Sequence, residues 1–374
     1  MKKIDVIITD SELKHSLATV RALGKEKLKV ATCSEKFSAT KLSRYSKYSF
    51  KYNKNNLITK VLENAGEDKT STLIPIGYNS NILCSKNKKI LMKKFNMLIA
   101  DYDKITLASD KEKINSILDK IKFPKPKTWI IKSMGDIKKV DFNGPMIIKS
   151  SQEMRGKKVE YLNNLEELKQ KAKERLNYGT QIVQERVRGF GCGFFALCKK
   201  GKVKVSFQHR RIREYPYSGG VSSCAESYYD PKLESLGKKI VKALNWEGIC
   251  MIEFICEDKT KNYKLIEMNA KFWGSLDLAI ASGINFPYLL YLEANNKPYT
   301  IPKYKTGVRF QWILPEDTLR IKTSPKKLGA IKEYLTDLFS FKVKKDIGYI
   351  FIDPLPTLLR IGATFIKLFK WNLN

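Results

Sequence analysis

Two carboxylates and an amide stand on neighbouring apolar segments of the sequence, in a pattern that suits a metal ion. Glu253 lies inside one apolar run, and Glu267 follows another, with Asn269 two residues further on. The polar segment 256–262 between the runs is typical of a turn, so we predict a β-hairpin. Because alternate strand residues face the same way, Glu267 and Asn269 should share a face, which Glu253 can also face. Carboxylates in apolar surroundings usually have a cation, and these oxygen ligands favour Mg²⁺, with Mn²⁺ as the alternative ion.

The same hairpin has a plainer interpretation. Its carboxylates could be solvated or paired with some of the many lysines, because short motifs of this kind also arise by chance. Lys271 lies two residues beyond Asn269, on the same expected face, where a lysine could meet a phosphate. The elements around the hairpin must decide between the two interpretations.

The first hundred residues alternate the patterns of strands and helices. Strands are expected at 4–8, 28–32 and 72–76, and helices at 11–23 and 56–64. This order predicts an open parallel sheet with helices on its faces. The sequence has no G-x-G-x-x-G turn after a strand, which argues against a dinucleotide site there.

An α+β region follows, and several candidate side chains stand at the ends of its strands. Lys149 closes the apolar strand 145–149, and Gln184 and Glu185 end the strand 180–187. The other expected elements are helices at 110–121, 165–176 and 233–244 and strands at 127–131, 158–161, 194–198 and 201–208. Residues from 301 onward are expected to form a separate appendage that ends in an amphipathic segment.

Bulk properties narrow the class of protein. The chain has 374 residues, enough for two or three domains, and a net charge of +32. Lysine is spread over the whole length, which favours a solvated basic surface over specific nucleic-acid binding and suits anionic partners such as ATP or anionic lipid. The seven cysteines show no paired spacing, so we expect reduced thiols in a cytoplasmic protein. The start of the chain resembles a strand more than a signal peptide, and no segment has the length of a membrane span.

The order of these parts resembles the ATP-grasp superfamily. Within it the chain is similar to the carboxylate–amine ligases related to carbamoyl-phosphate synthetase, biotin carboxylase and D-aspartate ligase. The residues that carry the resemblance are Lys149, the run 184–187 followed by Gly189, and the set Glu253, Glu267, Asn269 and Lys271. The resemblance implies an α/β Rossmann-like domain over residues 1–108, followed by an α+β ATP-grasp domain. Its two subdomains would span 109–186 and 187–300, and residues 301–374 would form a small extension with an amphipathic helix.

The resemblance also assigns roles to individual residues. It implies that ATP lies between the two subdomains, with Mg²⁺ held by Glu253, Glu267 and Asn269. Phosphate contacts would come from Lys127, Lys149 and the loop 150–158, which includes Ser150 and Gly156. Contacts to the adenine would come from Gln184, Glu185 and the backbone at Val187. Cys192 stands where many relatives carry a carboxylate for the ribose hydroxyls, and Lys271 replaces the usual arginine.

A basic segment next to a glycine pair is the candidate substrate site. Arg211 and Arg213 suit recognition of a carboxylate or phosphate, and Gly219-Gly220 allows close approach of the backbone. With Lys271, these arginines are the residues expected at the reacting groups. The alternative is a basic edge strand followed by a flexible loop.

The function that the resemblance implies is an ATP-dependent ligase. A small carboxylate would be phosphorylated to an acyl phosphate, and a small-molecule amine would then displace phosphate. The departures at Cys192 and Lys271 and the glycine-poor loop leave a second hypothesis open, a nucleotide-binding protein of this fold without ligase turnover.

The amphipathic segment 356–371 leaves the partners of the chain open. It could cover the core of the protein, contact a second copy in a homodimer, or lie on the inner face of a membrane. The expected localisation is accordingly cytoplasmic, with peripheral membrane contact as the alternative.

Overall fold

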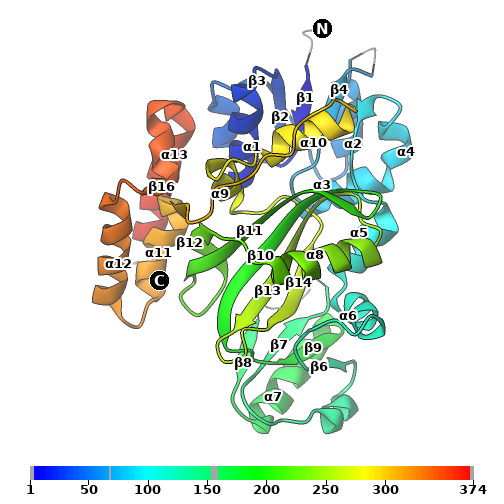
Figure 1. Cartoon of the computed structure of the whole chain (residues 1–374), viewed down its shortest axis with the longest axis vertical. Coiled ribbons are helices and arrows are strands. Elements are labelled where there is room, and N and C mark those ends of the chain that lie inside the picture. The colour runs from blue at the N-terminus through cyan, green and yellow to red at the C-terminus, as the bar shows by residue number, and fades with distance from the viewer. Residues whose placement is uncertain (1–3, 67–68, 153–158, 371–374) are drawn as a thin grey trace. The chain divides into compact units, whose positions relative to one another are not determined.

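The computed structural model describes residues 4–66, 69–152 and 159–370 (Figure 1). By packing, the chain divides into two compact units. Unit 1 contains Met1–Tyr102, Phe194–Met251 and Lys271–Asn374, and unit 2 contains Asp103–Gly193 and Ile252–Ala270. Because this division rests on packing alone, the subdomain boundaries predicted at 108, 186 and 300 stay a prediction.

Unit 1 begins with the predicted parallel sheet. Its five strands have the order β3-β2-β1-β4-β5, and every pair is parallel. The strands are β1 (Val6–Ile8), β2 (Val30–Ser34), β3 (Ser46–Lys51), β4 (Ser71–Ile74) and β5 (Phe95–Asn96), and the helices are α1 (Lys14–Lys25), α2 (Leu57–Glu63), α3 (Tyr78–Lys86) and α4 (Lys88–Leu91), with the 3₁₀ turn η1 (Ala39–Leu42). The sequence does not predict β3, because its largely exposed residues form no apolar run.

A second sheet has the order β14-β13-β10-β11-β12-β15-β16. Its strands are β10 (Gly189–Lys199), β11 (Lys202–Tyr215), β12 (Val221–Ser227), β13 (Gly248–Glu257), β14 (Tyr263–Asn269), β15 (Arg309–Gln311) and β16 (Val343–Lys345), with helices α8 (Pro231–Ala243), α9 (Leu276–Ala281) and α10 (Phe286–Ala294). Strand β14 belongs to unit 2, and β10 and β13 contribute residues to both units.

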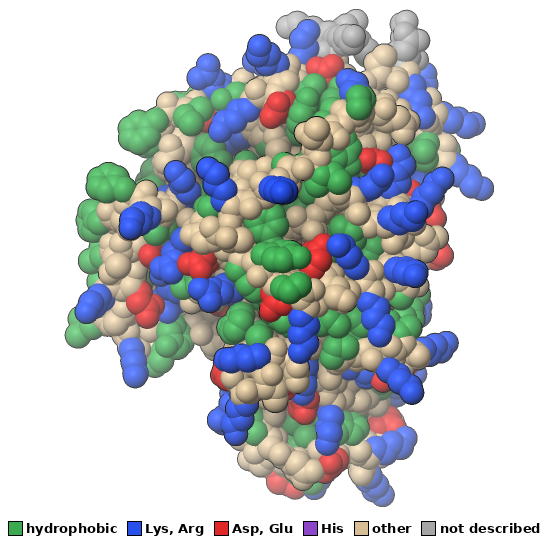
Figure 2. All heavy atoms as spheres, viewed as in Figure 1, with side chains coloured by type: hydrophobic (Ala, Val, Ile, Leu, Met, Phe, Trp, Pro, Cys, Tyr) green, Lys and Arg blue, Asp and Glu red, His purple; other side chains and the backbone are tan. Residues whose placement is uncertain are grey.

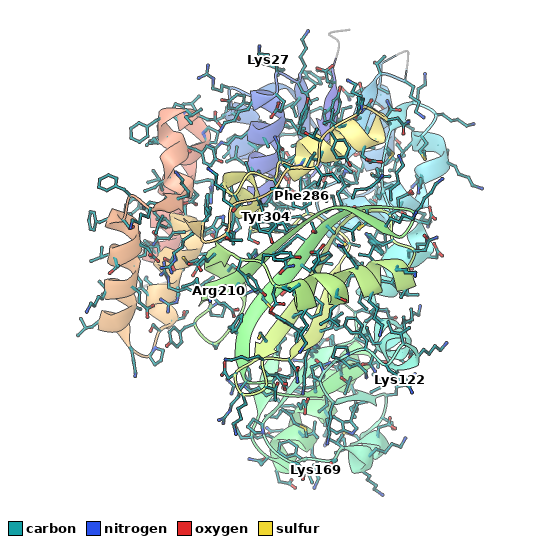
Figure 3. The ribbon with its side chains drawn as sticks, in the orientation of Figure 1. Lys27, Lys122, Lys169, Arg210, Phe286 and Tyr304 are labelled. Carbon is teal, nitrogen blue, oxygen red and sulfur yellow. The ribbon has the colours of Figure 1, made fainter. Side chains whose placement is uncertain are left out.

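Aromatic side chains fill the core of unit 1. Phe286 packs edge-on against Trp273 at 5.1 Å between ring centroids, and Tyr304 packs edge-on against Phe207 at 4.9 Å (Figure 3). Edge-to-face pairs of this kind add to the stabilisation that burial alone provides.

Unit 2 is built on a four-stranded antiparallel sheet with the order β6-β9-β7-β8. The strands are β6 (Thr128–Ile131), β7 (Met146–Ser150), β8 (Glu160–Leu162) and β9 (Gln181–Glu185), and the helices are α5 (Tyr102–Ser109), α6 (Lys111–Lys120) and α7 (Leu165–Arg175), with the 3₁₀ turns η2 (Met134–Lys139) and η3 (Leu176–Tyr178). Asp110 caps α6 by accepting hydrogen bonds from the backbone of Glu112 and Lys113, as its side-chain type predicts. The sheet packs on α7 through a cluster that includes Ile148, Leu168 and Val183.

The segment after residue 300 is less separate than the sequence predicts. Strand β15 pairs antiparallel with β12, and β16 pairs parallel with β15, so this segment completes the second sheet. The remaining elements are η4 (Ile313–Asp317), α11 (Thr318–Thr323), α12 (Lys327–Phe339), the 3₁₀ turn η5 (Asp346–Phe351) and α13 (Pro354–Lys370), which is the predicted amphipathic helix. None of the helices in the described residues has the length and apolar character needed to cross a bilayer.

The prediction of free cysteines is confirmed by the structure, and Figure 2 shows how the basic side chains lie on one face. All seven cysteines are free and buried. Lysine and arginine side chains are spread over the visible face rather than gathered in one patch (Figure 2), and Lys27, Lys122 and Lys169 are exposed on three different elements or loops (Figure 3).

Both histidines lie in unit 1, where His209 is buried and His15 is half-buried with both ring nitrogens buried. His209 stacks on Phe195 at 4.6 Å between ring centroids, and its Nε2 lies 2.8 Å from Ser275 Oγ. Burial, helped by the charge of Arg211, lowers the pKa of His209 to about 3. Burial, with Lys14 and Lys271, lowers the pKa of His15 to about 3 as well. Both rings are therefore neutral in the folded protein over the ordinary pH range.

These pKa values predict a loss of stability on acidification. Below pH 6.5 the unfolded chain binds protons at both histidines and the folded chain does not, so stability falls as the pH drops. The free energy of unfolding should fall between pH 7 and pH 5. We expect this decrease to be about 2 kcal/mol smaller in His209→Gln, whose glutamine can keep a hydrogen bond to Ser275. Urea unfolding of both proteins at each pH measures this difference. Equal pH dependence of the two proteins would contradict the neutral, buried ring.

Candidate functional site

The carboxylate and amide side chains of the hairpin meet on one face within unit 2. Asn269 Nδ2 lies 3.2 Å from Glu253 Oε1 and 3.0 Å from Glu267 Oε1. Glu253 comes from β13 and the other two from β14, as strand alternation predicts. Both carboxylates are half-buried, and Asn269 is buried.

The donor atoms of this cluster fit a hard divalent cation. The cluster offers two carboxylates and one amide. Among the described residues, no group of three or more His, Cys, Asp or Glu side chains is placed to hold a metal. Mg²⁺ is usually bound by one or two carboxylates, with substrate phosphates and water supplying the other oxygens. A rotation of the Asn269 amide would present its oxygen at the position now taken by its nitrogen. The set therefore suits Mg²⁺ that arrives with a phosphate ligand.

Lys149 is the last residue but one of β7 in the same unit and is buried, with 6% of its surface exposed. Burial lowers the pKa of Lys149 to about 8, although the charges of Glu267 and Glu253 act in the opposite direction. Burial of an ammonium is costly, and an anionic ligand would offset that cost.

Two polar atoms on the same sheet lack partners. The hydroxyl of Ser150 and the side-chain oxygen of Gln184 are buried without a hydrogen bond, while the amide nitrogen of Gln184 donates to Thr128 Oγ1 at 2.9 Å. Ser150 follows Lys149 on β7, and Gln184 lies opposite Ile147 in the β7–β9 pairing. Buried polar groups are nearly always hydrogen-bonded, so these atoms indicate a ligand.

Sequence reasoning missed one part of this region. A small pocket beside Glu267 and Asn269 is lined also by Ser109 and Lys111. The backbone nitrogen of Lys111 donates to Ser151 O at 2.8 Å, which ties the start of α6 to the residue after β7. The charge of Lys111 also acts to lower the pKa of Lys149. The sequence predicts the helix cap at Asp110, which lies between two of these lining residues, but it does not predict the pocket.

Comparison with known proteins identifies this part of the chain. A family model for the ATP-grasp domain matches residues 108–275. These residues form an ATP-grasp domain. They contain every side chain of unit 2 discussed above.

Solved structures share the fold over most of the chain. It is similar to a biotin carboxylase β,γ-ATP complex from Campylobacter jejuni, with 17% identity and a TM-score of 0.65 over 82% of this chain and 74% of that one. It is also similar to a phosphoribosylamine–glycine ligase from Thermotoga maritima, with 14% identity and a TM-score of 0.64 over 82% of this chain and 78% of that one. An L-amino acid ligase from Bacillus licheniformis shows 14% identity and a TM-score of 0.61 over 79% of this chain and 74% of that one. Comparison with curated proteins found no match. At these identities the likeness shows the fold, which is the ATP-grasp fold predicted from the sequence.

The other residues predicted to contact the nucleotide differ in their burial and in their partners. Glu185 is paired with Lys264, whose Nζ lies 2.6 Å from Glu185 Oε1, and Val187 is half-buried just after β9. Lys127 is exposed and its Nζ is 4.0 Å from Asp141 Oδ2. Gly156 lies outside the described residues.

Cys192 has surroundings that do not suit its predicted ribose contact. The residue is buried, and its thiol donates to the carbonyl of Phe254 at 3.6 Å. A side chain packed inward in this way is not available to a ribose hydroxyl. We therefore leave Cys192 out of the proposed ATP site.

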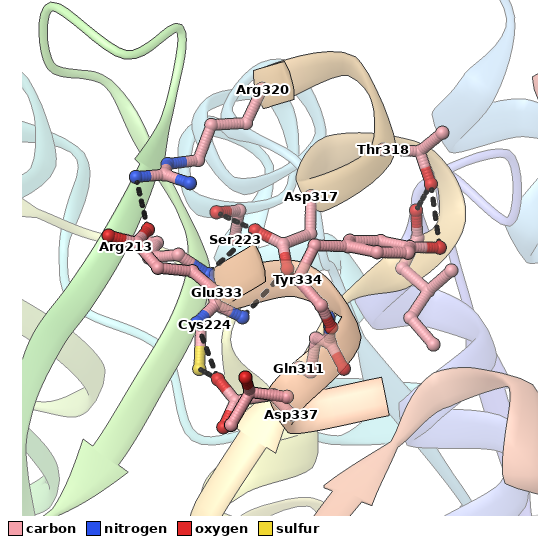
Figure 4. Close-up of polar contacts among 12 residues, drawn as sticks. Arg213, Ser223, Cys224, Gln311, Asp317, Thr318, Arg320, Glu333, Tyr334 and Asp337 are labelled. Atoms are coloured by element: carbon pink, nitrogen blue, oxygen red, sulfur yellow. Dashed lines mark hydrogen bonds and ion pairs between the residues drawn. The ribbon is translucent and has the colours of Figure 1, made fainter. Parts of the chain in front are cut away.

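Of the predicted substrate arginines, Arg213 has a different role. Its Nε and Nη2 donate to Asp317 at 3.0 and 2.8 Å, and its Nη1 donates to Asp337 (Figure 4). All three residues are buried, so Arg213 holds β11 to η4 and α12 within unit 1. This pairing corrects the prediction that Arg213 meets a substrate.

Arg211 and Lys271 keep surroundings compatible with substrate binding. Arg211 Nη1 donates to Glu214 Oε1 at 3.1 Å and to Gly220 O at 2.9 Å, which places it beside the predicted glycine pair. The ammonium of Lys271 lies 5.7 Å from the ring centroid of Tyr78, at the start of α3. Both residues belong to unit 1.

Proposed function

We propose that the protein is an ATP-dependent ligase that joins a carboxylate to an amine through an acyl phosphate. The observation that carries this proposal is the buried Lys149, with the unpartnered side-chain atoms of Ser150 and Gln184, in the same unit as the Glu253–Asn269–Glu267 cluster. A cationic group and a cation-binding cluster on one ATP-grasp domain are what a Mg²⁺-nucleotide requires. The named reactions of the ligases that share this fold support the choice of carboxylate and amine.

In this proposal Glu253, Glu267 and Asn269 would hold Mg²⁺, which would supply positive charge to the phosphates of the nucleotide. Lys149 forms an ion pair with the phosphates, and the hydroxyl of Ser150 donates a hydrogen bond to them. The second contact gives the Ser150 hydroxyl the hydrogen-bond partner that it otherwise lacks. Lys127 would meet the phosphates only through its long exposed side chain, and its role stays a prediction.

The adenine end of the nucleotide is assigned to the end of β9. Gln184 has a side-chain oxygen without a partner, which can accept a hydrogen bond from the amino group of adenine. Glu185 and the backbone at Val187 are the other predicted contacts. Because Glu185 is already paired with Lys264, we expect Gln184 to contribute more than Glu185 to nucleotide affinity.

The reaction needs no nucleophilic side chain. A carboxylate oxygen of the substrate attacks the γ-phosphorus, and ADP leaves with the electrons of the broken P–O bond. The amine nitrogen then attacks the acyl carbon, phosphate leaves, and the nitrogen loses a proton to give the amide. The protein contributes positioning and positive charge, and Arg211 and Lys271 are the proposed carboxylate contacts.

Trapping with hydroxylamine tests the acyl phosphate directly. We expect the purified protein, Mg²⁺-ATP and hydroxylamine to form a hydroxamate with one class of carboxylate in a panel, since hydroxylamine takes the place of the amine. ADP should form in equal amount. If the panel gives neither hydroxamate nor ADP, the ligase proposal fails.

The alternative is a protein of this fold that binds the nucleotide without turning it over. The lysine at position 271, where the relatives usually carry arginine, supports it, because lysine keeps the charge but loses the planar fork that clamps a carboxylate. ATP-dependent thermal stabilisation together with no ADP across the panel would identify this alternative. In either case we infer small-molecule partners and, from the seven free buried cysteines, a reducing, cytoplasmic compartment.

A further inference from the structure

Helix α12 turns its apolar stripe toward solvent. Leu328, Ile331, Leu335 and Phe339 follow one another at helical spacing and lie on one face, yet 85%, 38%, 40% and 74% of their surfaces are exposed. An amphipathic helix in a folded protein normally directs such a stripe at the core. The exposed stripe therefore calls for a partner outside the chain.

The inward face of α12 is polar, and its bonds hold the helix in this orientation. Asp337, which lies beside Arg213 in Figure 4, is buried and accepts hydrogen bonds from Arg213 and Arg309. The backbone oxygen of Tyr334 accepts a hydrogen bond from Gln311. Turning the apolar stripe inward would break the buried ion pair between Arg213 and Asp337. The outward direction of the stripe thus follows from the packing of unit 1.

Helix α13 repeats this arrangement. Thr357 and Arg360 face inward: Arg21 Nη2 donates to Thr357 Oγ1 at 3.0 Å, and Arg360 Nη2 lies 3.1 Å from Asp346 Oδ2. The outward residues are Leu355, Leu358, Leu359, Phe365 and Ile366, exposed by 41–57%. Two phenylalanines between these helices are highly exposed, Phe341 in the turn after α12 at 101% and Phe351 at the end of η5 at 90%. Figure 2 shows apolar side chains along the left edge, where Figure 1 places α12 and α13.

Positive charge surrounds the apolar side chains on this surface. The exposed lysines of the segment are Lys326, Lys327, Lys332, Lys342, Lys344 and Lys367. Of the carboxylates between residues 318 and 368, Asp337, Asp346 and Asp353 are buried in bonds to arginines, and Glu333 pairs with Arg320. The surface therefore presents phenylalanine, leucine and lysine, with little negative charge.

We propose that this surface, formed by α12, η5 and α13, binds the interface of an anionic lipid bilayer. Phenylalanine and leucine enter the boundary between headgroups and acyl chains, and the lysines around them pair with anionic headgroups. A symmetric contact with a second copy fits less well, because it would bring the same lysines of both copies together. The net charge of +32 adds long-range attraction to an anionic surface.

Co-sedimentation of the full chain with vesicles tests the proposal. We expect binding to phosphatidylcholine vesicles that contain a third phosphatidylglycerol, little binding to pure phosphatidylcholine, and loss of binding as salt is raised. The double variant Phe341→Ser/Phe351→Ser should bind at least about tenfold more weakly. Lys342→Glu/Lys344→Glu should show a similar loss, since each lysine near the surface contributes to affinity.

Ile90→Ser is the matched control, because Ile90 is an exposed apolar residue of α4, a separate helix of unit 1. It should bind vesicles like the unmodified chain. The exposed positions of Phe341 and Phe351 mean that their replacement should leave the thermal unfolding temperature unchanged, which confirms that each variant is folded. If the double variant bound vesicles as tightly as the unmodified chain, the proposal would be overturned. So would a concentration-dependent dimer, seen by sedimentation velocity and dissolved by the double variant, in a protein that does not bind vesicles.

Discussion

Replacing Glu267 by glutamine is expected to lower the rate of ATP cleavage by about 100- to 1,000-fold. Glutamine keeps the shape of the side chain and an oxygen that can accept the hydrogen bond from Asn269, but it removes one of the two negative charges of the cluster. With one carboxylate left, the site would bind Mg²⁺ weakly and leave the phosphate charge uncompensated. The rate of ADP release at saturating ATP, measured over a range of Mg²⁺ concentrations, gives the effect.

Asp258→Asn is the control for this variant. Asp258 is an exposed carboxylate in the turn of the same hairpin, so its replacement removes the same charge from a place outside the cluster. We expect ADP release within about twofold of the unmodified protein, because exposed charges away from a site have small effects. If Glu267→Gln kept full activity, or if both variants lost activity equally, the Mg²⁺ site would have to lie elsewhere.

Replacing Arg213 by alanine is expected to destabilise the folded protein by about 3–5 kcal/mol. The change leaves the buried carboxylates of Asp317 and Asp337 without their shared partner, although Asp337 keeps a contact with Arg309. Burial of an unpaired charge is among the largest single losses of stability that one substitution causes. Urea unfolding followed by circular dichroism measures the loss.

Arg210→Ala is the matched control on the same strand. Arg210 is exposed and its Nη2 pairs with Glu226 at 2.7 Å, so its loss should cost at most about 1 kcal/mol. The comparison separates the ion pair from the general effect of removing an arginine from β11. A stable Arg213→Ala protein whose KM for the carboxylate rises would instead restore the substrate role that the sequence predicts.

The sequence predicts the parts of the fold and site that depend on local pattern. Alternation along 263–269 places Glu267 and Asn269 on one face, and the apolar run before Lys149 places that lysine at the end of a strand. Both follow from the period of a β-strand, which needs no knowledge of distant residues. The parallel N-terminal sheet is predicted in the same way, from alternating strands and helices.

The features that the sequence does not predict depend on distant partners. Arg213 stands in a segment rich in arginine and glycine, which indicates a binding loop. Its partners Asp317 and Asp337 lie 104 and 124 positions later, and only the packing of unit 1 brings them together. The exposure of the apolar stripe of α12 also depends on distant residues. The spacing of the stripe is typical of a buried face, but Asp337 on the opposite face is bonded inward to Arg213, which leaves the stripe exposed.

The central claim is that ATP cleavage on this domain is coupled to joining a carboxylate and an amine. The most direct test incubates the protein with Mg²⁺-ATP and paired panels of carboxylates and amines, and measures ADP and amide together by mass spectrometry. The proposed function predicts that one class of pair gives ADP and amide in equal amounts, and that Glu267→Gln abolishes both. ATP that binds and stabilises the protein, yet gives no ADP with any pair, would contradict it.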